Sequence, residues 1–479
     1  MKKLKILFVT TEALPFVRTS NMADFTYNLT RKLKELNTDV RLVMPLFKSI
    51  KTDYNSSLRF VKSFVVDLGY KVHTATILSL DVEGVLFYFV DSDVYFDRPR
   101  IYGERDDAER FIFFNKAVNL MMKEIDFKPD IIDVNNYASS LIPACIKTKR
   151  QVDSFYHGIK TVLSIHNIRN QGIYPAKDMD SIASLPLELM EDREYKYFKA
   201  VNFLKAGIDS ADYITLPAPS LKEEIVSPYY GSNLDNLLIA NSFKVTGILD
   251  GIDHRRYDPE KDPAIFQNFG ADTLEERAIN KQGVMSYYSL SGFERPLISV
   301  IGRLITRKGV DFVYENIDYM VEAGFNIIIM GTGEPAYEDK LLEKEQEYPQ
   351  NISVKLYVNE KEAIRVMAGS DFFLMPSRTE IQALNQLIAQ RYGAIPIVRA
   401  TGTLKDGIRE YNKFTKKGDG IIFQNMREKD FRAAIDEAKK LYEDEPETLE
   451  IMRRNALMKD SSWEKTAEEY LRLFQEISE

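Results

Sequence analysis

The chain has 479 residues, 44% of them hydrophobic and 28% charged, a composition typical of a globular protein too long for a single core, so two domains are expected. A formal net charge of -8 leaves no basic excess for following a nucleic acid, so we expect none as a partner. The one cysteine, Cys145, excludes an intramolecular disulfide and a multi-cysteine zinc site, and its apolar neighbours indicate a buried small residue.

The first predicted element is a buried strand over residues 4–10. A basic start followed by so short an apolar run is typical of a first strand, not of a signal peptide. No stretch of the sequence approaches the roughly 20 apolar residues that span a bilayer. We therefore expect a cytoplasmic protein without membrane contact.

A helix with Phe25, Leu29, Leu33 and Leu36 on one face follows the first strand. Strand-like runs and helical patterns then alternate, which predicts a parallel, doubly wound sheet. The further strands expected in this half lie at 39–45, 84–89, 131–134, 161–165 and 211–216.

The pattern restarts at Pro296, after a stretch rich in turn-forming residues over 246–260 that we take as a domain boundary. Helices are expected over 310–323, where Gly324 supplies the stop, over 381–392, and over 463–477, an amphipathic helix that needs a surface to cover. A second Rossmann-like sheet is predicted from strands at 297–301, 326–330, 354–358, 372–375, 395–398 and 420–423.

The most informative segment is 301–309, which places Arg303 and Lys308 just after a buried strand. Open α/β sheets bind ligands at the carboxyl ends of their strands, and two cations before a helix form a socket for a phosphate or diphosphate. Two solvated surface charges are an about equally good interpretation of such a pair taken alone.

Several ordered motifs make the chain resemble bacterial glycogen synthases and plant starch synthases, which transfer glucose from ADP-glucose to an α-1,4-glucan. The likeness runs nearly from end to end. Its main pieces are 164–167 with 171–172, 203–207, 247–253 with 258–260, 302–309, 376–378, and 391–393 with 396–399.

The resemblance implies an α/β fold of two Rossmann-like domains facing a cleft, the glycosyltransferase B architecture. We expect an acceptor-side domain over 1–250, completed by a returning helix at 463–479, and a nucleotide-sugar domain over 251–462. It further implies transfer with retention of anomeric configuration, no metal or other cofactor, and a nucleotide sugar and an α-glucan as the molecules bound.

Four residues match family positions with catalytic roles. Arg303 and Lys308 match the cations that meet the negative charge growing on the leaving diphosphate. Glu380 matches the carboxylate that holds glucose hydroxyls, although a carboxylate at a helix start is also an ordinary stabiliser. His166 matches a histidine lying against the sugar; without the family, a structural histidine is the better interpretation.

The resemblance also assigns residues to substrate binding. Gly402, Thr403 and Leu404 match a segment whose amides meet the diphosphate, but Thr403 replaces a glycine, and its β-carbon restricts close approach. The other positions carried over from the family motifs are Arg18, Asp24, Asn167, Gln171 and Asp250.

The chain departs from the family pattern mainly in the cleft motifs. Ser20 and Asn21 replace a glycine pair, and as strong helix caps their side chains can occupy amides that the glycines leave bare. A family run rich in histidine reads Asp-Val-Asn-Asn-Tyr-Ala over 133–138. Asp250 replaces an asparagine, and Gln382 with Ala383 replaces a Cys-Gly pair, which would crowd a helix N-terminus that in the family normally lies against glucose.

Three hypotheses follow. The first is an active glucan synthase with an altered cleft. The second is a transferase of this fold with a changed donor or acceptor. The third is a weak or inactive paralogue that binds glucan or another synthase subunit. A homo-oligomer, or association with another synthase, is compatible with each of them.

Overall fold

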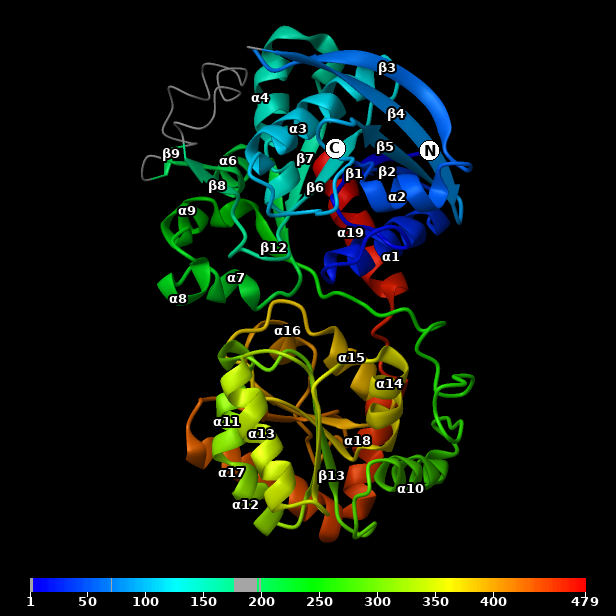
Figure 1. Cartoon of the computed structure of the whole chain (residues 1–479), viewed down its shortest axis with the longest axis vertical. Helices are drawn as coiled ribbons and strands as arrows, with labels where there is room; N and C mark the ends of the chain where they lie inside the picture. Colours follow the sequence, from blue (N-terminus) through cyan, green and yellow to red (C-terminus); the bar gives the residue numbers. More distant parts are fainter. Residues whose placement is uncertain (1–2, 70, 176–195, 198–199) are drawn as a thin grey trace. The chain divides into compact units, whose positions relative to one another are not determined.

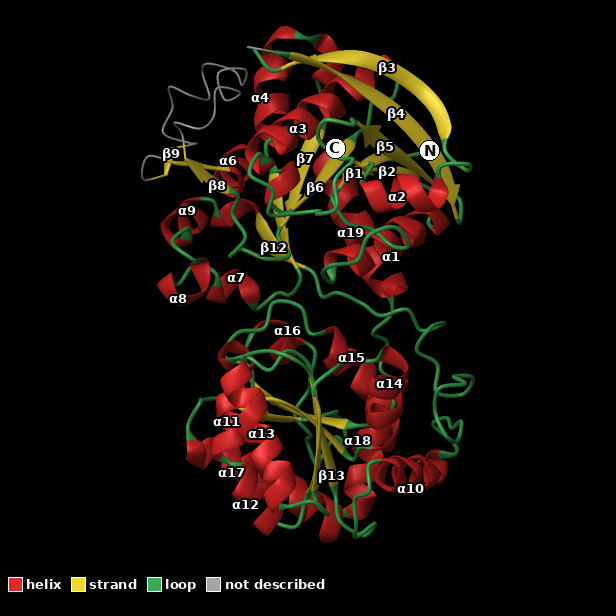
Figure 2. Ribbon diagram, viewed as in Figure 1, coloured by secondary structure: helices red, strands yellow, loops and turns green. Residues whose placement is uncertain are grey.

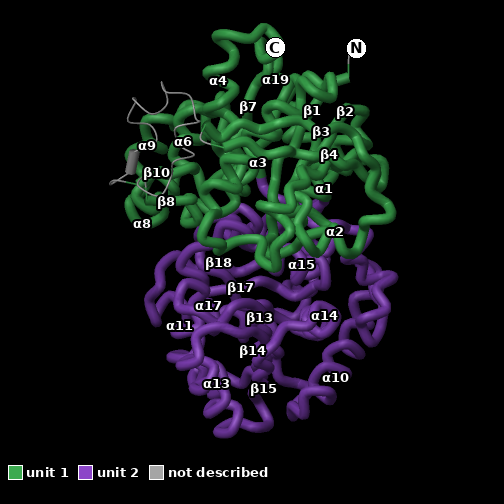
Figure 3. Tube along the Cα trace, turned by 45° about the horizontal axis from the view of Figure 1, so that its top comes forward, with its two compact units in different colours: residues 1–248, 463–479 green, residues 249–462 purple. Residues whose placement is uncertain are grey.

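The computed structural model describes residues 3–69, 71–175, 196–197 and 200–479. The chain divides into two compact units, each with its own sheet. Unit 1 comprises Met1–Ile248 with Trp463–Glu479, and unit 2 comprises Leu249–Ser462 (Figure 3).

Unit 1 is built on a nine-stranded sheet with the order β12-β11-β7-β6-β1-β2-β5-β4-β3. Its central strands are buried on both faces, as expected of parallel strands between helices. Their bounds are β1 Lys5–Val9, β2 Asp39–Pro45, β5 Val85–Asp91, β6 Ile131–Asn135, β7 Lys160–Ser164, β11 Tyr213–Leu216 and β12 Val245–Gly247.

One edge of this sheet is antiparallel, which the sequence pattern did not predict. Strands β3 (Arg59–Asp67) and β4 (Val72–Val82) pair antiparallel with each other, and β4 pairs antiparallel with β5. Most β3 side chains are exposed, so the strand lacks the buried apolar run that marks the central strands. The sheet is therefore mixed. A small antiparallel sheet, β8 Ile173–Pro175, β10 Ala200–Asn202 and β9 Lys196–Tyr197, completes the described strands of unit 1.

The helix at the end of the chain belongs to unit 1. Helix α19 (Trp463–Ser478) packs against α1 (Met22–Glu35), as Figure 1 shows in red and blue. The ring of Phe25 meets those of Trp463 and Tyr470 edge to face, with centroids 5.9 and 5.6 Å apart. The other helices of this unit are α2 Lys48–Tyr54, α3 Asp107–Glu124, α4 Ile142–Val152, α6 Phe203–Ser210, α7 Leu221–Glu224, α8 Pro228–Gly231 and α9 Asp235–Ala240.

Unit 2 has a six-stranded, fully parallel sheet with helices on both faces (Figure 2). The strand order is β15-β14-β13-β16-β17-β18, and two hydrophobic cores fill the space between the sheet and its helices. The strands are β13 Leu297–Ile301, β14 Asn326–Met330, β15 Ile352–Lys355, β16 Phe372–Met375, β17 Ile395–Arg399 and β18 Ile421–Phe423. The helices are α10 Arg277–Tyr287, α11 Val310–Glu315, α12 Ile317–Glu322, α13 Pro335–Glu347, α14 Glu360–Gly369, α15 Leu384–Arg391, α16 Gly402–Asp406, α17 Glu428–Glu443 and α18 Pro446–Met458.

Two predicted helices of unit 2 are wrong in detail. The one expected over 310–323 is interrupted at Asn316, whose side-chain amide donates to the carbonyl of Phe312 and so competes with helix continuation. The one expected over 381–392 begins at Leu384. Glu380 therefore lies in the preceding loop and not at a helix start.

Two further expectations can be compared with the described residues. Cys145 is buried, as predicted. Among the described residues, no helix has the length and apolar character that crossing a bilayer requires.

Candidate functional site

The loop after β13 carries the first group of candidate residues in unit 2. It passes very close to the loop after β14, where a Cβ on Gly331 would lie 1.8 Å from the carbonyl oxygen of Gly302. At its end Gly309 has φ +79°, and a Cβ there would lie 2.2 Å from the carbonyl oxygen of Pro376. Only glycine fits at these two positions without a steric clash. The backbone of the loop after β13 can therefore contact the loops after β14 and β16 directly.

Lys308 and Glu380 meet where these two loops converge. The ammonium Nζ of Lys308 donates to Glu380 Oε2 at 2.5 Å, and Ser377 Oγ donates to the same oxygen at 3.0 Å. Glu380 is 3% exposed and the Lys308 side chain 24% exposed. The fold thus joins two predicted site residues in one partly buried ion pair.

Arg303 stands apart from that pair. Its side chain is exposed, and it makes no hydrogen bond or ion pair with any residue that the structure describes. Arg303 and Lys308 leave the same strand end within six positions of each other, which fits a guanidinium and an ammonium contacting one anionic ligand.

The loop that carries Glu380 is held by two arginines to which the sequence reasoning assigned no role. Arg378 forms a bidentate ion pair with Asp311 of α11, at 2.7 and 2.6 Å, and also donates to the carbonyl of Thr306. Arg399, at the end of β17, donates to the carbonyls of Ser377 and Arg378. Both arginines lie in motifs that carry the family resemblance, so a charged side chain next to a predicted strand end was the sequence signal that could have indicated their role.

The segment 402–404 approaches Glu380 from the next strand end. The amide of Thr403 donates to the Glu380 carbonyl at 3.2 Å, so this amide is already used within the protein. The Thr403 hydroxyl is buried and has no partner among the described residues. Gly402 has φ +47°, whereas the side chain of Leu404 is fully buried in a core of unit 2 and cannot itself contact substrate.

Asp250 lies on the same unit and contacts the Glu380 loop. Gln382 Nε2 donates to Asp250 Oδ2 at 2.8 Å, whereas Oδ1 is enclosed without a partner in the described part of the chain. Burial raises the pKa of Asp250 to about 7, and the hydrogen bond from Gln382 opposes that rise. Asp250 and Gln382, both changed from the family pattern, are thus joined by the fold.

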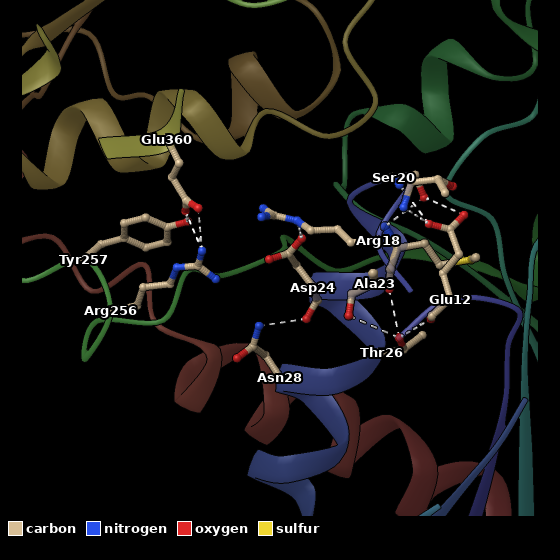
Figure 4. A network of polar contacts seen from close by, with 12 residues as sticks. Glu12, Arg18, Ser20, Ala23, Asp24, Thr26, Asn28, Arg256, Tyr257 and Glu360 are labelled. Carbon is tan, nitrogen blue, oxygen red and sulfur yellow. Dashed lines mark hydrogen bonds and ion pairs between the residues drawn. The ribbon is translucent and has the colours of Figure 1, made fainter. Parts of the chain in front are cut away.

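In unit 1 the loop before α1 is organised around Glu12 (Figure 4). The buried Glu12 carboxylate accepts hydrogen bonds from the amides of Thr19 and Ser20 at 2.7 and 2.8 Å, and from the hydroxyl of Tyr102 at 2.9 Å. Ser20 Oγ accepts from the amide of Met22 at 3.3 Å, as expected of a capping side chain. Asn21, in contrast, makes no side-chain capping bond.

Arg18 and Asp24, both assigned to substrate binding, form an ion pair with each other. Arg18 Nε donates to Asp24 Oδ2 at 2.9 Å, and the guanidinium is more exposed than the carboxylate (Figure 4). The contact with Asp24 fixes one edge of the Arg18 guanidinium.

His166 follows β7 and is held by the segment that replaces the family's histidine-rich run. Its Nε2 lies 2.8 Å from Asn135 Oδ1, and its ring meets Phe25 edge to face at 4.4 Å. Asn136 Oδ1 accepts from the amides of His166 and Asn167 at 2.8 and 3.1 Å. Burial lowers the pKa of His166 to about 3, so its imidazole is neutral at physiological pH. The segment 133–138, although it departs from the family pattern, therefore supplies polar contacts to His166 and Asn167.

The two remaining candidates of unit 1 make local bonds. Asn167 Oδ1 accepts from the amide of Arg169 at 3.1 Å, closing a turn. Gln171 accepts from Asn202 at 2.7 Å and donates to the carbonyl of Ser232 at 2.8 Å. Both groups of the Gln171 amide are thus engaged in holding the loop.

No group of three or more His, Cys, Asp or Glu side chains suited to hold a metal ion occurs among the described residues. Arg303, Lys308 and Glu380 are among the charged groups that follow the carboxyl ends of the unit 2 strands. Such a set can bind a phosphorylated ligand that also carries hydroxyl groups.

Comparisons with known proteins cover the whole chain. Residues 5–240 match the family model described as starch synthase catalytic domain, and residues 290–457 match that of glycosyl transferases group 1. A glycogen synthase of Anoxybacillus flavithermus is 37% identical over 99% of this chain and 98% of its own length. A glycogen synthase of Clostridium kluyveri is 38% identical over 99% of this chain and 100% of its own length. The catalytic domain of starch synthase IV from Arabidopsis thaliana, solved with ADP and acarbose, superposes with a TM-score of 0.87 at 25% identity, covering all of both chains.

Proposed function

This chain belongs to the glycogen synthase and starch synthase family of glycosyltransferases, and from that membership we propose that it transfers glucose from ADP-glucose to the non-reducing end of an α-1,4-glucan. The observation that carries the proposal is the meeting of Lys308 with Glu380, at the end of the same loop that carries the exposed Arg303. The glucan product in this proposal is taken from the relatives, which are glycogen synthases, and the nucleotide is taken from the ADP bound in the Arabidopsis structure.

The chemistry follows from the charges. Transfer breaks the bond between the anomeric carbon of glucose and a diphosphate oxygen, so negative charge builds on the leaving ADP. Arg303 and Lys308 stabilise that charge, and each such hydrogen bond to a charged group is worth about 1.5 to 3 kcal/mol. We propose that these cations suffice without a metal ion, and that the new bond forms with retention of configuration.

Glu380 has a second part in this proposal. Its carboxylate is an acceptor for glucose hydroxyls, and Ser377 keeps one of its oxygens oriented. In the structure Lys308 neutralises Glu380, so an arriving diphosphate competes with the carboxylate for the same ammonium group. Binding then exchanges one charged partner of Lys308 for another, which limits the desolvation cost of the exchange.

Unit 1 supplies the acceptor side in this proposal. His166 is neutral and fixed by Asn135, so in this proposal it adds no charge beside the sugar. Arg18, steadied by Asp24, provides a cation on the same unit. Both residues keep a defined geometry although the loops around them differ from the family pattern.

The test is transfer of labelled glucose from ADP-glucose and, in parallel, UDP-glucose to glycogen and maltoheptaose, with a thermal-shift titration by ADP. We expect transfer from ADP-glucose and stabilisation by ADP. Transfer from UDP-glucose alone would replace the donor in the proposal. ADP stabilisation without transfer from either donor would contradict the proposed reaction and favour a non-catalytic paralogue.

A further inference from the structure

A row of buried polar side chains crosses the sheet of unit 1 toward the carboxyl ends of its central strands. Asp133 and Asn135 lie on the same face of β6. Ser164 ends β7, and Thr215 lies in β11. Each of these four residues is at most 1% exposed, and the row leads to His166, two residues after β7. Buried polar groups are costly unless they are satisfied, so the partners of each atom decide what the row does.

The side-chain amide of Asn135 has one orientation that satisfies its contacts. Nδ2 lies 3.0 Å from Asp133 Oδ1 and 3.2 Å from the carbonyl oxygen of Val9, so each of its two hydrogens meets an acceptor. Turning the amide over would place its oxygen against both of these acceptors. Asn135 Oδ1 therefore faces His166, whose Nε2 lies 2.8 Å away.

The orientation of Asn135 decides which nitrogen of His166 carries the hydrogen. An amide oxygen only accepts, so Nε2 must be the donor in this contact. Burial lowers the pKa of His166 to about 3, so its ring carries a single hydrogen at neutral pH. With that hydrogen on Nε2, Nδ1 keeps its lone pair. Any group that meets Nδ1 has to donate, as a sugar hydroxyl does and an ionised phosphate oxygen does not.

Asp133 holds the amide of Asn135 in both of its protonation states. As a carboxylate it accepts from Asn135 Nδ2 and from the hydroxyl of Ser164, whose Oγ lies 3.0 Å from both carboxyl oxygens. As a neutral acid it still accepts from Asn135 through Oδ1, while Oδ2 donates to Ser164. The hydroxyl oxygens of Ser164 and Thr215 are 2.7 Å apart, and either can donate, so this end of the row adapts to both states.

We propose that Asp133 and Asn135 are positioning residues that act through His166, because together they hold its imidazole as the Nε2–H tautomer. Both positions differ from the family's histidine-rich run, so the pair is a feature of this chain's own sequence. The tautomer is a property of the folded protein by itself. Its effect on glucose transfer rests on the proposed function, in which His166 lies beside the sugar.

The first experiment determines the tautomer by NMR of the full-length protein, labelled with nitrogen-15 in its histidine rings, near neutral pH. The chain has four histidines, and the signal that is missing from His166→Gln identifies His166. We expect a protonated Nε2 and an unprotonated Nδ1. Asn135→Leu keeps the approximate volume and removes the acceptor. It should lower the ratio of the Nε2–H to the Nδ1–H tautomer about fivefold or more, the worth of one neutral hydrogen bond.

Variants of Asp133 separate its acceptor atoms from its charge. Asp133→Asn keeps an acceptor for the Asn135 amide and should leave the tautomer ratio unchanged. Asp133→Leu removes that acceptor and should lower the ratio less than Asn135→Leu does, because the Val9 carbonyl still holds the amide. Asn119→Leu is the matched control, since Asn119 is another buried asparagine of unit 1, whose side chain donates to a carbonyl within α3. It should destabilise the protein without changing the tautomer ratio.

The second experiment measures kcat and KM for transfer from ADP-glucose in the same variants. Asn135→Leu should lower kcat/KM most and Asp133→Leu less, in the order in which they lower the tautomer ratio. Asp133→Asn should restore the activity that Asp133→Leu loses, and Asn119→Leu should stay within about twofold of the unaltered protein. Affinity for ADP, measured by calorimetric titration, should not change, since the cations proposed to bind it, Arg303 and Lys308, lie on unit 2.

Three results would overturn the inference. An unchanged tautomer ratio in Asn135→Leu would mean that Asn135 does not set it, and an equal change in Asn119→Leu would assign the effect to general destabilisation. A changed ratio with unchanged kcat/KM would remove the pair from the reaction. If Asn135→Leu does not fold, the comparison of Asp133→Leu with Asp133→Asn decides in its place. Failure of the proposed function gives a different pattern, namely no transfer by the unaltered protein, and the tautomer ratios then decide by themselves whether the pair sets the tautomer.

Discussion

Replacing Lys308 by alanine leaves Glu380 without its cation. Removing one partner of a fully buried ion pair costs about 3 to 5 kcal/mol, whereas an exposed pair is worth about 0 to 1 kcal/mol. The exposed fraction is 24% for Lys308 and 3% for Glu380, and Ser377 still donates to the carboxylate in the variant. We therefore expect an intermediate loss of about 2 kcal/mol, which lowers the melting temperature of a unit of this size by roughly 4 to 8 °C.

The assay is a double-mutant cycle with Glu380→Gln, followed by calorimetry. The glutamine removes the charge while keeping the size of the side chain, so the double variant should be more stable than Lys308→Ala by at least about 1 kcal/mol. Calorimetry is needed because Trp463, the one tryptophan of the chain, lies in unit 1 and its fluorescence reports that unit. Lys355→Ala is the control, since Lys355 and Glu345 pair at 3.5 Å with side chains that are 31% and 29% exposed, and its loss should cost less than about 1 kcal/mol.

A Lys308→Ala variant that melts at the temperature of the unaltered protein would refute this reasoning. So would a cycle in which the two substitutions add without coupling. Either result would mean that the pair contributes no net stability, and that Glu380 tolerates burial without Lys308.

Three further predictions concern particular residues. Gly309→Ala should lower the free energy of unfolding, measured in urea, by about 2 to 4 kcal/mol, because the residue has φ +79° and its new Cβ would meet the Pro376 carbonyl. Gly324→Ala, at φ +99° with open space around it, should cost only about 1 to 2 kcal/mol. Similar losses in the two variants would contradict the steric clash with Pro376. The pKa of His166 is lowered to about 3, so between pH 6.5 and about 3 the folded protein binds fewer protons than the unfolded chain. The stability that the neutral His166 contributes is therefore complete above pH 6.5 and is lost as the pH falls to about 3. His166→Gln should reduce this dependence of the unfolding free energy on pH, measured by urea titration with Trp463 fluorescence. Burial raises the pKa of Asp133 to about 8, so the stability of the folded protein falls as the pH rises from about 4 to 8. Asp133→Asn should be more stable than the unaltered protein at pH 8 and should lose that advantage toward pH 4. A difference in stability that does not depend on pH would exclude the titration of Asp133 as its cause.

The strands that the sequence predicted best are those buried on both faces. The predicted bounds of β2, β13, β14 and β16 agree with the structure at both ends, because a continuous apolar run between turn residues has few alternative folds. The edge strand β3 escaped prediction because most of its side chains face solvent, and its place is decided by pairing with β4. The late start of α15 has a similar cause, since the preceding loop is held by contacts from distant segments.

The candidate site divides in the same way. The sequence by itself determined the chemical types available, because Arg303 and Lys308 follow a buried strand and the motifs around them identify the family. It could not determine which groups meet, since Lys308 and Glu380 are 72 positions apart and Asp250 and Gln382 are 132 apart. Only the tertiary structure decided these pairs. The physical reason is that hydrogen bonds and ion pairs act over about 3 Å, and the loops reach that distance only after the sheet of unit 2 has aligned its strand ends.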